Sequence, residues 1–263
     1  MATRLQPPQI NAPPPEPPED DGHELRMSLL EHLEELRNRA FKAVLALVVG
    51  TLLGSLFAGQ VFQYLLEPYG RQVQVLDPTG TVTNYFRVAL LIGGIVAVPV
   101  ITYQLLMFII PGLTRKERRL VLTALPAITG LFLFGVLFTW FALVPPALDF
   151  LKNFQSQVFN VQWTADGYLA FVTSLLFWFG VAFEMPLVFF VLALFDVVHS
   201  KSLLKNWRIA IVGASVVAAV ITPTVDPVNM FLAMSPLLVL YVLSIILVAF
   251  AERGRRRREA EES

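Results

Sequence analysis

The sequence predicts an all-α membrane protein with six transmembrane helices, several of them kinked, and both termini in the cytoplasm. Hydrophobic residues make up 56% of its 263 residues and charged residues only 15%, whereas a soluble domain carries about 25% charged residues. A helix needs about 20 mostly apolar residues to cross the ~30 Å hydrocarbon layer. Six segments approach or exceed this length, and a charge interrupts only one of them, at Glu184: 43–66, 88–114, 120–148, 167–195, 209–225 and 227–251.

The basic residues are distributed unevenly between the two faces of this predicted arrangement. An even number of spans brings both termini to one side of the membrane. Of the 20 basic residues, only Arg71, Arg87 and Lys152 then lie on the opposite side. Cytoplasmic loops carry the excess of Lys and Arg, so we expect both termini in the cytoplasm. The formal net charge of zero hides this asymmetry.

The N-terminal part changes character before the first span. Residues 1–25 are rich in proline and acidic residues, which is typical of a disordered leader and unlike a secretory signal. An amphipathic surface helix should then begin at Ser28, where Glu31 completes a capping box. The first span is expected at 41–57, and a mixed outer loop leads to the second span at 85–110.

The later spans are delimited by prolines and charges. The third should stop at Pro145 and Pro146, because proline rings remove backbone donors, and prolines inside the spans should kink them. The fifth and sixth form a short hairpin, and the fifth covers only about 20 Å, so it needs bilayer thinning or a partner. The transmembrane domain, 26–252, thus includes spans at 120–144, 167–195, 208–221 and 229–250, followed by a basic then acidic tail at 253–263.

Glu184 is the one carboxylate inside a predicted span. A charged side chain at the middle of a membrane helix costs about 2.5–3.5 kcal/mol on insertion scales. Gln104, in the second span, lies at a similar depth, so the two polar groups could meet. Two interpretations are open at this point: a protonated acid that holds two helices together, or a polar patch that a partner uses.

Two other carboxylates stand out in basic surroundings. Glu35 lies in Glu34-Glu35-Leu36-Arg37, and Glu117 lies within Arg115-Lys116-Glu117-Arg118-Arg119. Glu35 and Arg39 are i,i+4 partners, and such pairs contribute a few tenths of a kcal/mol. On spacing alone, local neutralisation is the simpler interpretation of both carboxylates.

Four motifs in order resemble the segments of one family. They are His32-Leu33-Glu34-Glu35-Leu36-Arg37-Asn38-Arg39, Tyr103-Gln104 followed by Phe108 and Pro111-Gly112-Leu113, Lys116-Glu117-Arg118-Arg119, and Phe183-Glu184-Met185-Pro186. Together they resemble the C subunit of the twin-arginine translocase, the TatC family. The hairpin from Thr222-Pro223 to Asp226 and the segment from Ser235-Pro236 to Tyr241 also look like that family's final helix pair, so the resemblance covers nearly the whole folded chain. Asn84 departs from the acidic residue expected before the second span, and Arg87 stands where many relatives carry Lys.

The resemblance implies a receptor and core subunit that exports folded proteins across a prokaryotic inner membrane, driven by the proton-motive force. The cargo's twin-arginine signal peptide would bind at Glu35 and Glu117, with Glu34 and Arg37 beside them, since guanidinium groups favour carboxylate acceptors. The implied partners are single-span TatA and TatB subunits, the lipid bilayer and further copies of this chain. No cofactor, metal or nucleic acid is implied.

The short fifth span offers those partner helices a surface. Apolar residues recur there at i, i+3, i+7 and i+11, and a threonine at the outer end could add a hydrogen bond to a partner. Asp226 and Pro227 are expected to fix the following turn, because Asx-Pro pairs are common turn formers. The predicted docking residues are Ile209, Val212, Val216, Val220 and Thr222.

Other classes of membrane protein fit the sequence less well. The main alternative is a proton-coupled secondary transporter for a small solute with Glu184 as its proton site, but no inverted repeat is evident. For an intramembrane enzyme, the sequence lacks the residues needed for nucleophilic or zinc chemistry. The chain has no cysteine, its three histidines lie outside the predicted spans, and it contains no H-E-x-x-H or G-x-S-x-G motif.

Overall fold

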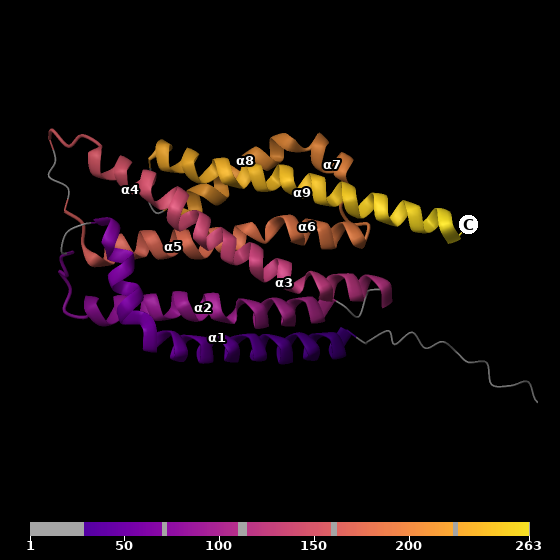
Figure 1. Cartoon of the computed structure of the whole chain (residues 1–263), viewed down its shortest axis with the longest axis horizontal. Coiled ribbons are helices and arrows are strands. Elements are labelled where there is room, and N and C mark those ends of the chain that lie inside the picture. Colours follow the sequence, from indigo (N-terminus) through magenta and orange to yellow (C-terminus); the bar gives the residue numbers. More distant parts are fainter. Residues whose placement is uncertain (1–28, 70–72, 110–114, 159–161, 223–225, 263) are drawn as a thin grey trace, which may run out of the picture.

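The computed structural model describes residues 29–69, 73–109, 115–158, 162–222 and 226–262, and this part of the chain is almost entirely helical. Its single β feature is an isolated bridge between Gln74 and Thr164. The leader at 1–25 and Ser28, the expected cap of the first helix, lie outside the described residues. The elements, shown in Figure 1, are α1 (Leu29–Leu66), the 3₁₀ turn η1 (Glu67–Tyr69), α2 (Gly80–Ile109), α3 (Arg115–Phe138), the π-helix η3 (Thr139–Leu143), α4 (Val144–Asn153), α5 (Ala165–Phe183), α6 (Met185–Leu194), α7 (Ser200–Lys205), α8 (Trp207–Ile221) and α9 (Pro227–Glu262).

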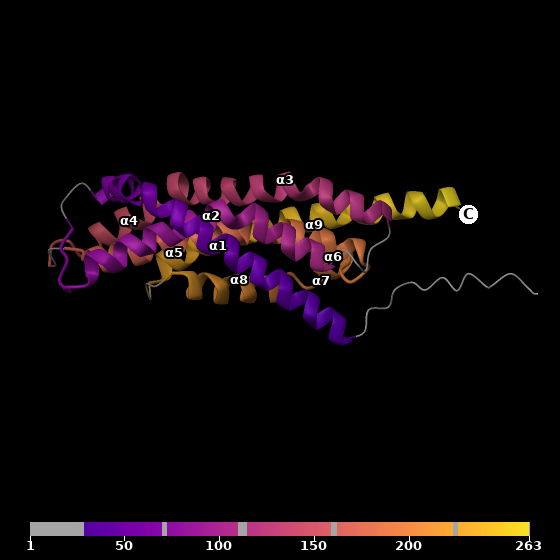
Figure 2. The ribbon, with the colours of Figure 1, turned by 90° about the horizontal axis from the view of Figure 1, so that it is seen from below.

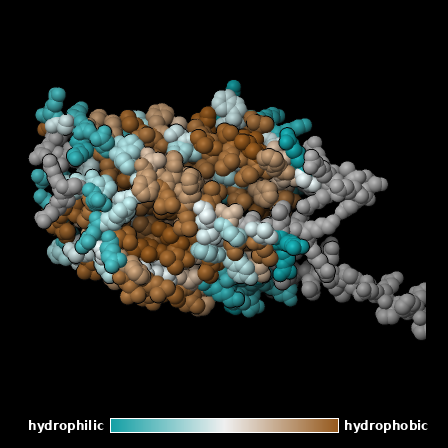
Figure 3. Space-filling model, viewed as in Figure 1, coloured by the Kyte–Doolittle hydropathy of each residue, from teal (hydrophilic) through white to brown (hydrophobic). Residues whose placement is uncertain are grey.

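Five helical stretches of the described chain are long and apolar enough to cross a membrane, which confirms the all-α membrane class. They are Glu31–Tyr69, Gly80–Phe108, Leu125–Asn153, Ala165–Leu194 and Pro227–Gly254, while Trp207–Ile221 is a shorter apolar helix. Figure 3 shows a broad hydrophobic band with hydrophilic residues at both ends of the molecule. This distribution is what a bilayer requires of a protein surface.

Helix α5 is the most buried element and lies inside the bundle. Its inward side chains include Leu169, Val172, Leu175 and Phe179, all 1% exposed or less. It contacts α2, α3 and α8, and α6 continues it against α9. In Figure 1, α5 and α6 run between α2 on one side and α8 with α9 on the other, and Figure 2 shows α3 and α8 on opposite faces of that layer.

Helix α1 is held mainly by close backbone contact with α2. A Cβ atom at Gly50 would lie 2.6 Å from the carbonyl oxygen of Gly93, and one at Gly54 would lie 2.7 Å from that of Ala89. A Cβ at Gly93 would overlap the backbone of Thr51. Small residues four apart allow this approach of membrane helices. We call Gly50, Gly54 and Gly93 the glycine seam.

The first span is longer than predicted. Instead of a surface helix, a span at 41–57 and a loop from 58, the chain forms one helix of 38 residues, Leu29–Leu66. It ends two residues before Pro68, whose ring disfavours helical geometry in the preceding residue. The end of the helix is fixed to α5, since Tyr168 Oη donates to the Leu65 carbonyl at 2.7 Å.

The predicted break at Pro145 and Pro146 was wrong. The π-helix η3 lies directly before them, and both prolines fall in the first turn of α4, where backbone N–H groups need no helical partner. The helical path therefore continues to Asn153. Proline breaks a helix only where its missing N–H or its ring disturbs an established turn.

Proline had different effects in the other spans. The fourth span is divided at Glu184 into α5 and α6, with Pro186 in the first turn of α6. Pro99, Pro126 and Pro236 lie inside α2, α3 and α9, each of which is a continuous helix. The sixth span is not short: α9 has 36 residues and carries the predicted tail as part of the helix.

Helix α9 is attached to the short helix α7 at two points, Tyr241 and Glu252. The Glu252 carboxylate accepts hydrogen bonds from the Ser200 backbone N–H at 2.8 Å and from its hydroxyl at 2.6 Å. Tyr241 Oη donates to the Leu203 carbonyl at 2.7 Å. These contacts hold α7, and with it the start of α8, against α9.

The glycine seam makes a testable prediction about stability. Replacing Gly93 with Ala should lower the thermal stability of the protein in detergent by about 1–3 kcal/mol, because the new methyl group overlaps Thr51. The matched control is Gly130→Ala in α3, where a Cβ meets no atom within 4 Å and alanine favours the helix by up to about 1 kcal/mol. Equal melting temperatures for the two variants would contradict the close packing.

Candidate functional site

The N-terminal turns of α1 carry a cluster of acidic and basic side chains. Arg37 Nη2 donates to Glu34 Oε1 at 3.0 Å on an exposed surface. Arg39 Nε donates to Glu35 Oε1 at 2.8 Å, and Arg39 Nη2 contacts the same oxygen. The predicted local pairing of Glu35 with Arg39 is therefore present.

Glu35 nevertheless keeps an unused acceptor. Its side chain is only 16% exposed, and Oε2 is buried with no hydrogen-bond partner among the described residues. His32 Nδ1 lies 3.9 Å from Oε2, beyond hydrogen-bond range. A buried carboxylate oxygen without a donor is costly, so a cationic ligand that reached Oε2 as neighbouring side chains moved aside would remove that cost.

The same end of the bundle includes the end of α2 and the start of α3. The His32 ring stacks on Phe108, with centroids 4.3 Å apart and planes at 19°, which joins α1 to α2 there. Glu117 belongs to the first turn of α3, but its side chain lies outside the described residues. Arg118 and Arg119 are exposed. Figure 1 shows the beginnings of α1 and α3 and the C-terminus at this end.

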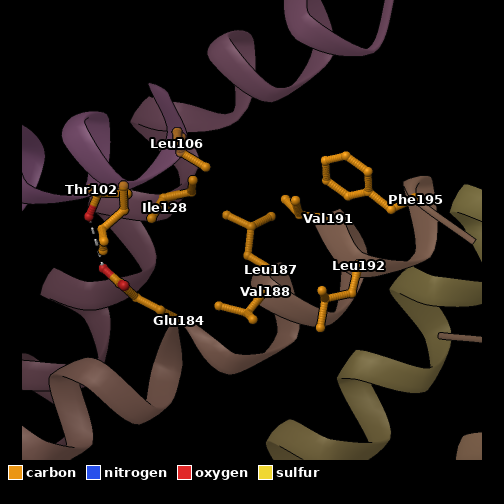
Figure 4. Close-up of a pocket in the computed structure, with 10 residues that line it drawn as sticks. Thr102, Leu106, Ile128, Glu184, Leu187, Val188, Val191, Leu192 and Phe195 are labelled. Atoms are coloured by element: carbon orange, nitrogen blue, oxygen red, sulfur yellow. Dashed lines mark hydrogen bonds between the residues drawn. The ribbon is translucent and has the colours of Figure 1, made fainter. Parts of the chain in front are cut away.

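A second site lies within the membrane-spanning region, at the junction of α5 and α6. Thr102 Oγ1 in α2 donates to Glu184 Oε1 at 3.5 Å (Figure 4). Both residues lie at one end of a cavity of about 200 Å³. The remaining walls are apolar and come from α2, α3, α6 and the residue after α6: Leu105, Leu106, Ile128, Leu187, Val188, Val191, Leu192 and Phe195.

The structure brings Thr102 to Glu184 in place of the predicted Gln104. Residues two positions apart on a helix differ by about 200° in direction, so Thr102 and Gln104 face different sides of α2. Gln104 is half-buried and does not line the cavity. Depth along the span was a sound guide, but the direction of the side chain decides the contact.

The predicted docking face of α8 is exposed. Ile209 is 70% exposed, Val212 61%, Val216 58% and Val220 73%, whereas Ala218 on the opposite face is fully buried.

Thr222 differs from its prediction, since it is only 4% exposed. Its hydroxyl donates to the Ala218 carbonyl at 2.7 Å, so it is not available to a partner helix.

Asp226 and Pro227 form the start of α9. One Asp226 oxygen accepts from the Asn229 backbone N–H at 2.7 Å and the other from the Asn229 side-chain amide at 2.9 Å. Pro227 is the first residue of the helix, where its fixed φ angle is favourable. This is the geometry of a helix N-cap, which agrees with a role in the turn.

In the part of the chain that the structure describes, no group of three or more His, Cys, Asp or Glu residues is arranged to hold a metal ion.

Comparisons with known proteins agree on one family. The family model for the Sec-independent protein translocase protein (TatC) matches residues 31–236. TatC of Synechocystis is 37% identical over 219 residues, covering 83% of this chain and 86% of that protein. The chloroplastic TATC of Arabidopsis thaliana is 36% identical over 219 residues, covering 82% of this chain and 64% of that protein.

The fold agrees as well. A crystal structure of the twin-arginine translocase receptor TatC superposes with a TM-score of 0.76 at 36% identity, covering 84% of this chain and all of that chain. Together with the apolar helices of the bundle, these matches identify a multi-pass membrane component of a protein translocase. The chain belongs to the TatC family.

Proposed function

We propose that this chain is the receptor subunit of a twin-arginine translocase, that it binds the paired arginines of signal peptides, and that it takes part in proton-motive-force-driven export of folded proteins. The observation that carries the proposal is the unused buried oxygen of Glu35 within a basic surface. A guanidinium group presents a planar set of donors that matches such a carboxylate better than an ammonium group does.

The surroundings of Glu35 favour selective binding. The exposed Arg37, Arg118 and Arg119 repel cationic peptides in general, so an arginine pair gains only where carboxylates receive it. Glu34 and Glu117 are the further carboxylates proposed for this role. Arg39 occupies only one oxygen of Glu35, which leaves the other for the signal peptide.

We also propose six membrane crossings, with both termini in the cytoplasm of a prokaryotic cell and the protein in its inner membrane. The beginning of α1 and the end of α9 lie at the same end of the bundle (Figure 1), and that end carries Arg118, Arg119 and Lys201. Positive residues mark the cytoplasmic side. Helix α8 then crosses with 15 residues, about 22 Å, which requires a thinner bilayer or a partner.

Single-span TatA and TatB subunits are the proposed partners of this short helix, with self-association as a further expectation. The exposed face of Ile209, Val212, Val216 and Val220 supplies the contact. The intramembrane patch of Glu184, now with Thr102 and with Gln104 nearby on α2, is proposed to serve a partner helix. A polar group at membrane depth is favourable to a partner that can hydrogen-bond it.

The signal site is tested by replacing its carboxylates. Glu117→Ala should abolish photo-crosslinking of a twin-arginine signal peptide to the purified protein. Glu35→Gln should weaken it about tenfold or more, because one charge-assisted hydrogen bond is lost. Glu34 lies beside Glu35, which makes the second effect the smaller one.

Glu67→Gln is the matched control, since Glu67 lies in η1 at the other end of α1. Unchanged crosslinking in the Glu117 variant, or an equal loss in the Glu67 variant, would contradict the proposed site.

Cysteine scanning tests the docking face of α8, and the absence of native cysteine makes it clean. Cysteines at 209, 212, 216 and 220 should form disulfides with a cysteine on a TatA-type or TatB-type span, whereas cysteines at 218, 221 and 222 should not, because those positions are at most 4% exposed. Crosslinks without this three- to four-residue period would exclude α8 as the docking surface.

The intramembrane patch is tested with Glu184→Ala. Protein transport should fall while the melting temperature in detergent holds or rises, because a costly polar group leaves the membrane-spanning region. Thr102→Val is the companion variant, since it removes only the hydrogen bond to Glu184. A large loss of stability with normal transport per folded molecule would instead assign Glu184 a purely structural role.

A further inference from the structure

A second groove lies toward the opposite end of the bundle, away from Glu35 and Glu184. Helices α1, α2 and α5 form it, and its volume is about 280 Å³, just below the usual range of about 300–1,000 Å³ for ligand pockets. Arg87 is the only charged residue among those that line it. The lining residues are Leu47, Arg87, Leu90, Leu91, Gly94, Thr173, Ser174, Phe177 and Trp178.

Hydrogen bonds from one nitrogen of its guanidinium group hold Arg87 in place. Its Nη1 donates to Asn84 Oδ1 at 2.8 Å and lies 3.3 Å from both the carbonyl and the carboxylate oxygen of Asp166. These hydrogen bonds all use one nitrogen, so Nε and Nη2 make no hydrogen bond to the described residues. The side chain is 32% exposed. Asn84, which anchors it, is fully buried, and its amide nitrogen has no partner in the described chain.

The Arg87 end of the groove lies near the lipid headgroup boundary, and the groove runs from there toward the middle of the membrane. Helices α2 and α5 start side by side, joined by the Arg87–Asp166 ion pair. Arg87 is seven residues from the start of α2 and Ser174 nine from that of α5, or about 10 and 14 Å. The apolar stretch Gly80–Phe108 has 29 residues, about 43 Å, so it extends roughly 7 Å beyond each side of a ~30 Å hydrocarbon layer.

We propose that this groove binds one anionic phospholipid. Its phosphodiester would accept from Nε and Nη2 of Arg87, and one acyl chain would lie on Leu47, Leu90 and Phe177. Ser174 adds a hydroxyl about 4 Å deeper in the membrane than Arg87, and Trp178, 45% exposed, lines the deeper part of the groove. A guanidinium at the rim of an apolar groove matches a charged headgroup on an apolar chain.

Free phosphate shares the headgroup chemistry but gains nothing from the apolar walls. The Asp166 carboxylate, 3.3 Å from Arg87, also weakens the attraction of Arg87 for an anion. An anion held by charge alone should therefore bind poorly. The acyl chain is therefore the part of the ligand that distinguishes a membrane lipid from a soluble anion.

Native mass spectrometry of the full chain in detergent with added phosphatidylglycerol tests the proposal. The wild-type protein should retain one phosphatidylglycerol in preference to phosphatidylcholine. Arg87→Gln and Gly94→Leu should each reduce its retention about tenfold or more. A Cβ at Gly94 meets only the Phe177 ring, at 3.8 Å, so the leucine fills the groove while Arg87 keeps its partners.

Lys152→Gln is the control, since Lys152 is an exposed cation in α4, and it should leave retention unchanged. Retention that survives Gly94→Leu would overturn the proposal, as would equal retention of phosphatidylcholine or displacement of the lipid by inorganic phosphate. If Arg87→Gln fails to fold, the two single variants Arg87→Lys and Gly94→Leu carry the same test. Arg87→Lys should keep the bound phosphatidylglycerol, and Gly94→Leu should lose it.

Discussion

Backbone-to-backbone contact along the glycine seam is the interaction on which the placement of α1 depends. In a membrane, lipid surrounds apolar side chains as well as protein does, so hydrophobic burial does not draw helices together. Most large side chains along α1 are accordingly exposed. Gly50, Gly54 and Gly93 instead permit close approach, and this contact holds the helix that carries Glu34 and Glu35. The acidic cluster at the bundle end thus rests on residues with no side chain.

Hydropathy predicted the class of the fold and most of its helices, because the length of an apolar run follows directly from bilayer thickness. It was weakest at the ends of the helices. The uncharged run 43–66 reaches the end of α1, although the span was expected to stop at 57, and α9 continues through the charged residues of 253–262. Pro145 and Pro146 misled for another reason: a π-helix turned them into first-turn residues. The motif Gly50-x-x-x-Gly54 was visible in the sequence and could have indicated the seam.

For the candidate site, sequence identified residues but not their directions. Glu184 was found because a charge in an apolar run is conspicuous, whereas Thr102 was missed because a threonine costs little in a span. Thr222 was expected to face outward, yet it bonds back to its own helix. Asn84 was noticed as a departure from the family, and its anchoring of Arg87 needed the structure. Contacts between helices depend on rotation about the helix axis, which no local pattern determines.

The attachment of α9 to α7 has a mechanical consequence. Tyr241 and Glu252 are eleven residues apart on one rigid rod, about 16 Å along its axis, and both are fastened to α7. Two separate contacts fix the direction of α9 relative to α7 as well as its position. Only Asn206 separates α7 from α8. A change in the direction of α9 would therefore be passed to α8 through α7. The direction of α9 is thus coupled through α7 to that of the short apolar helix α8.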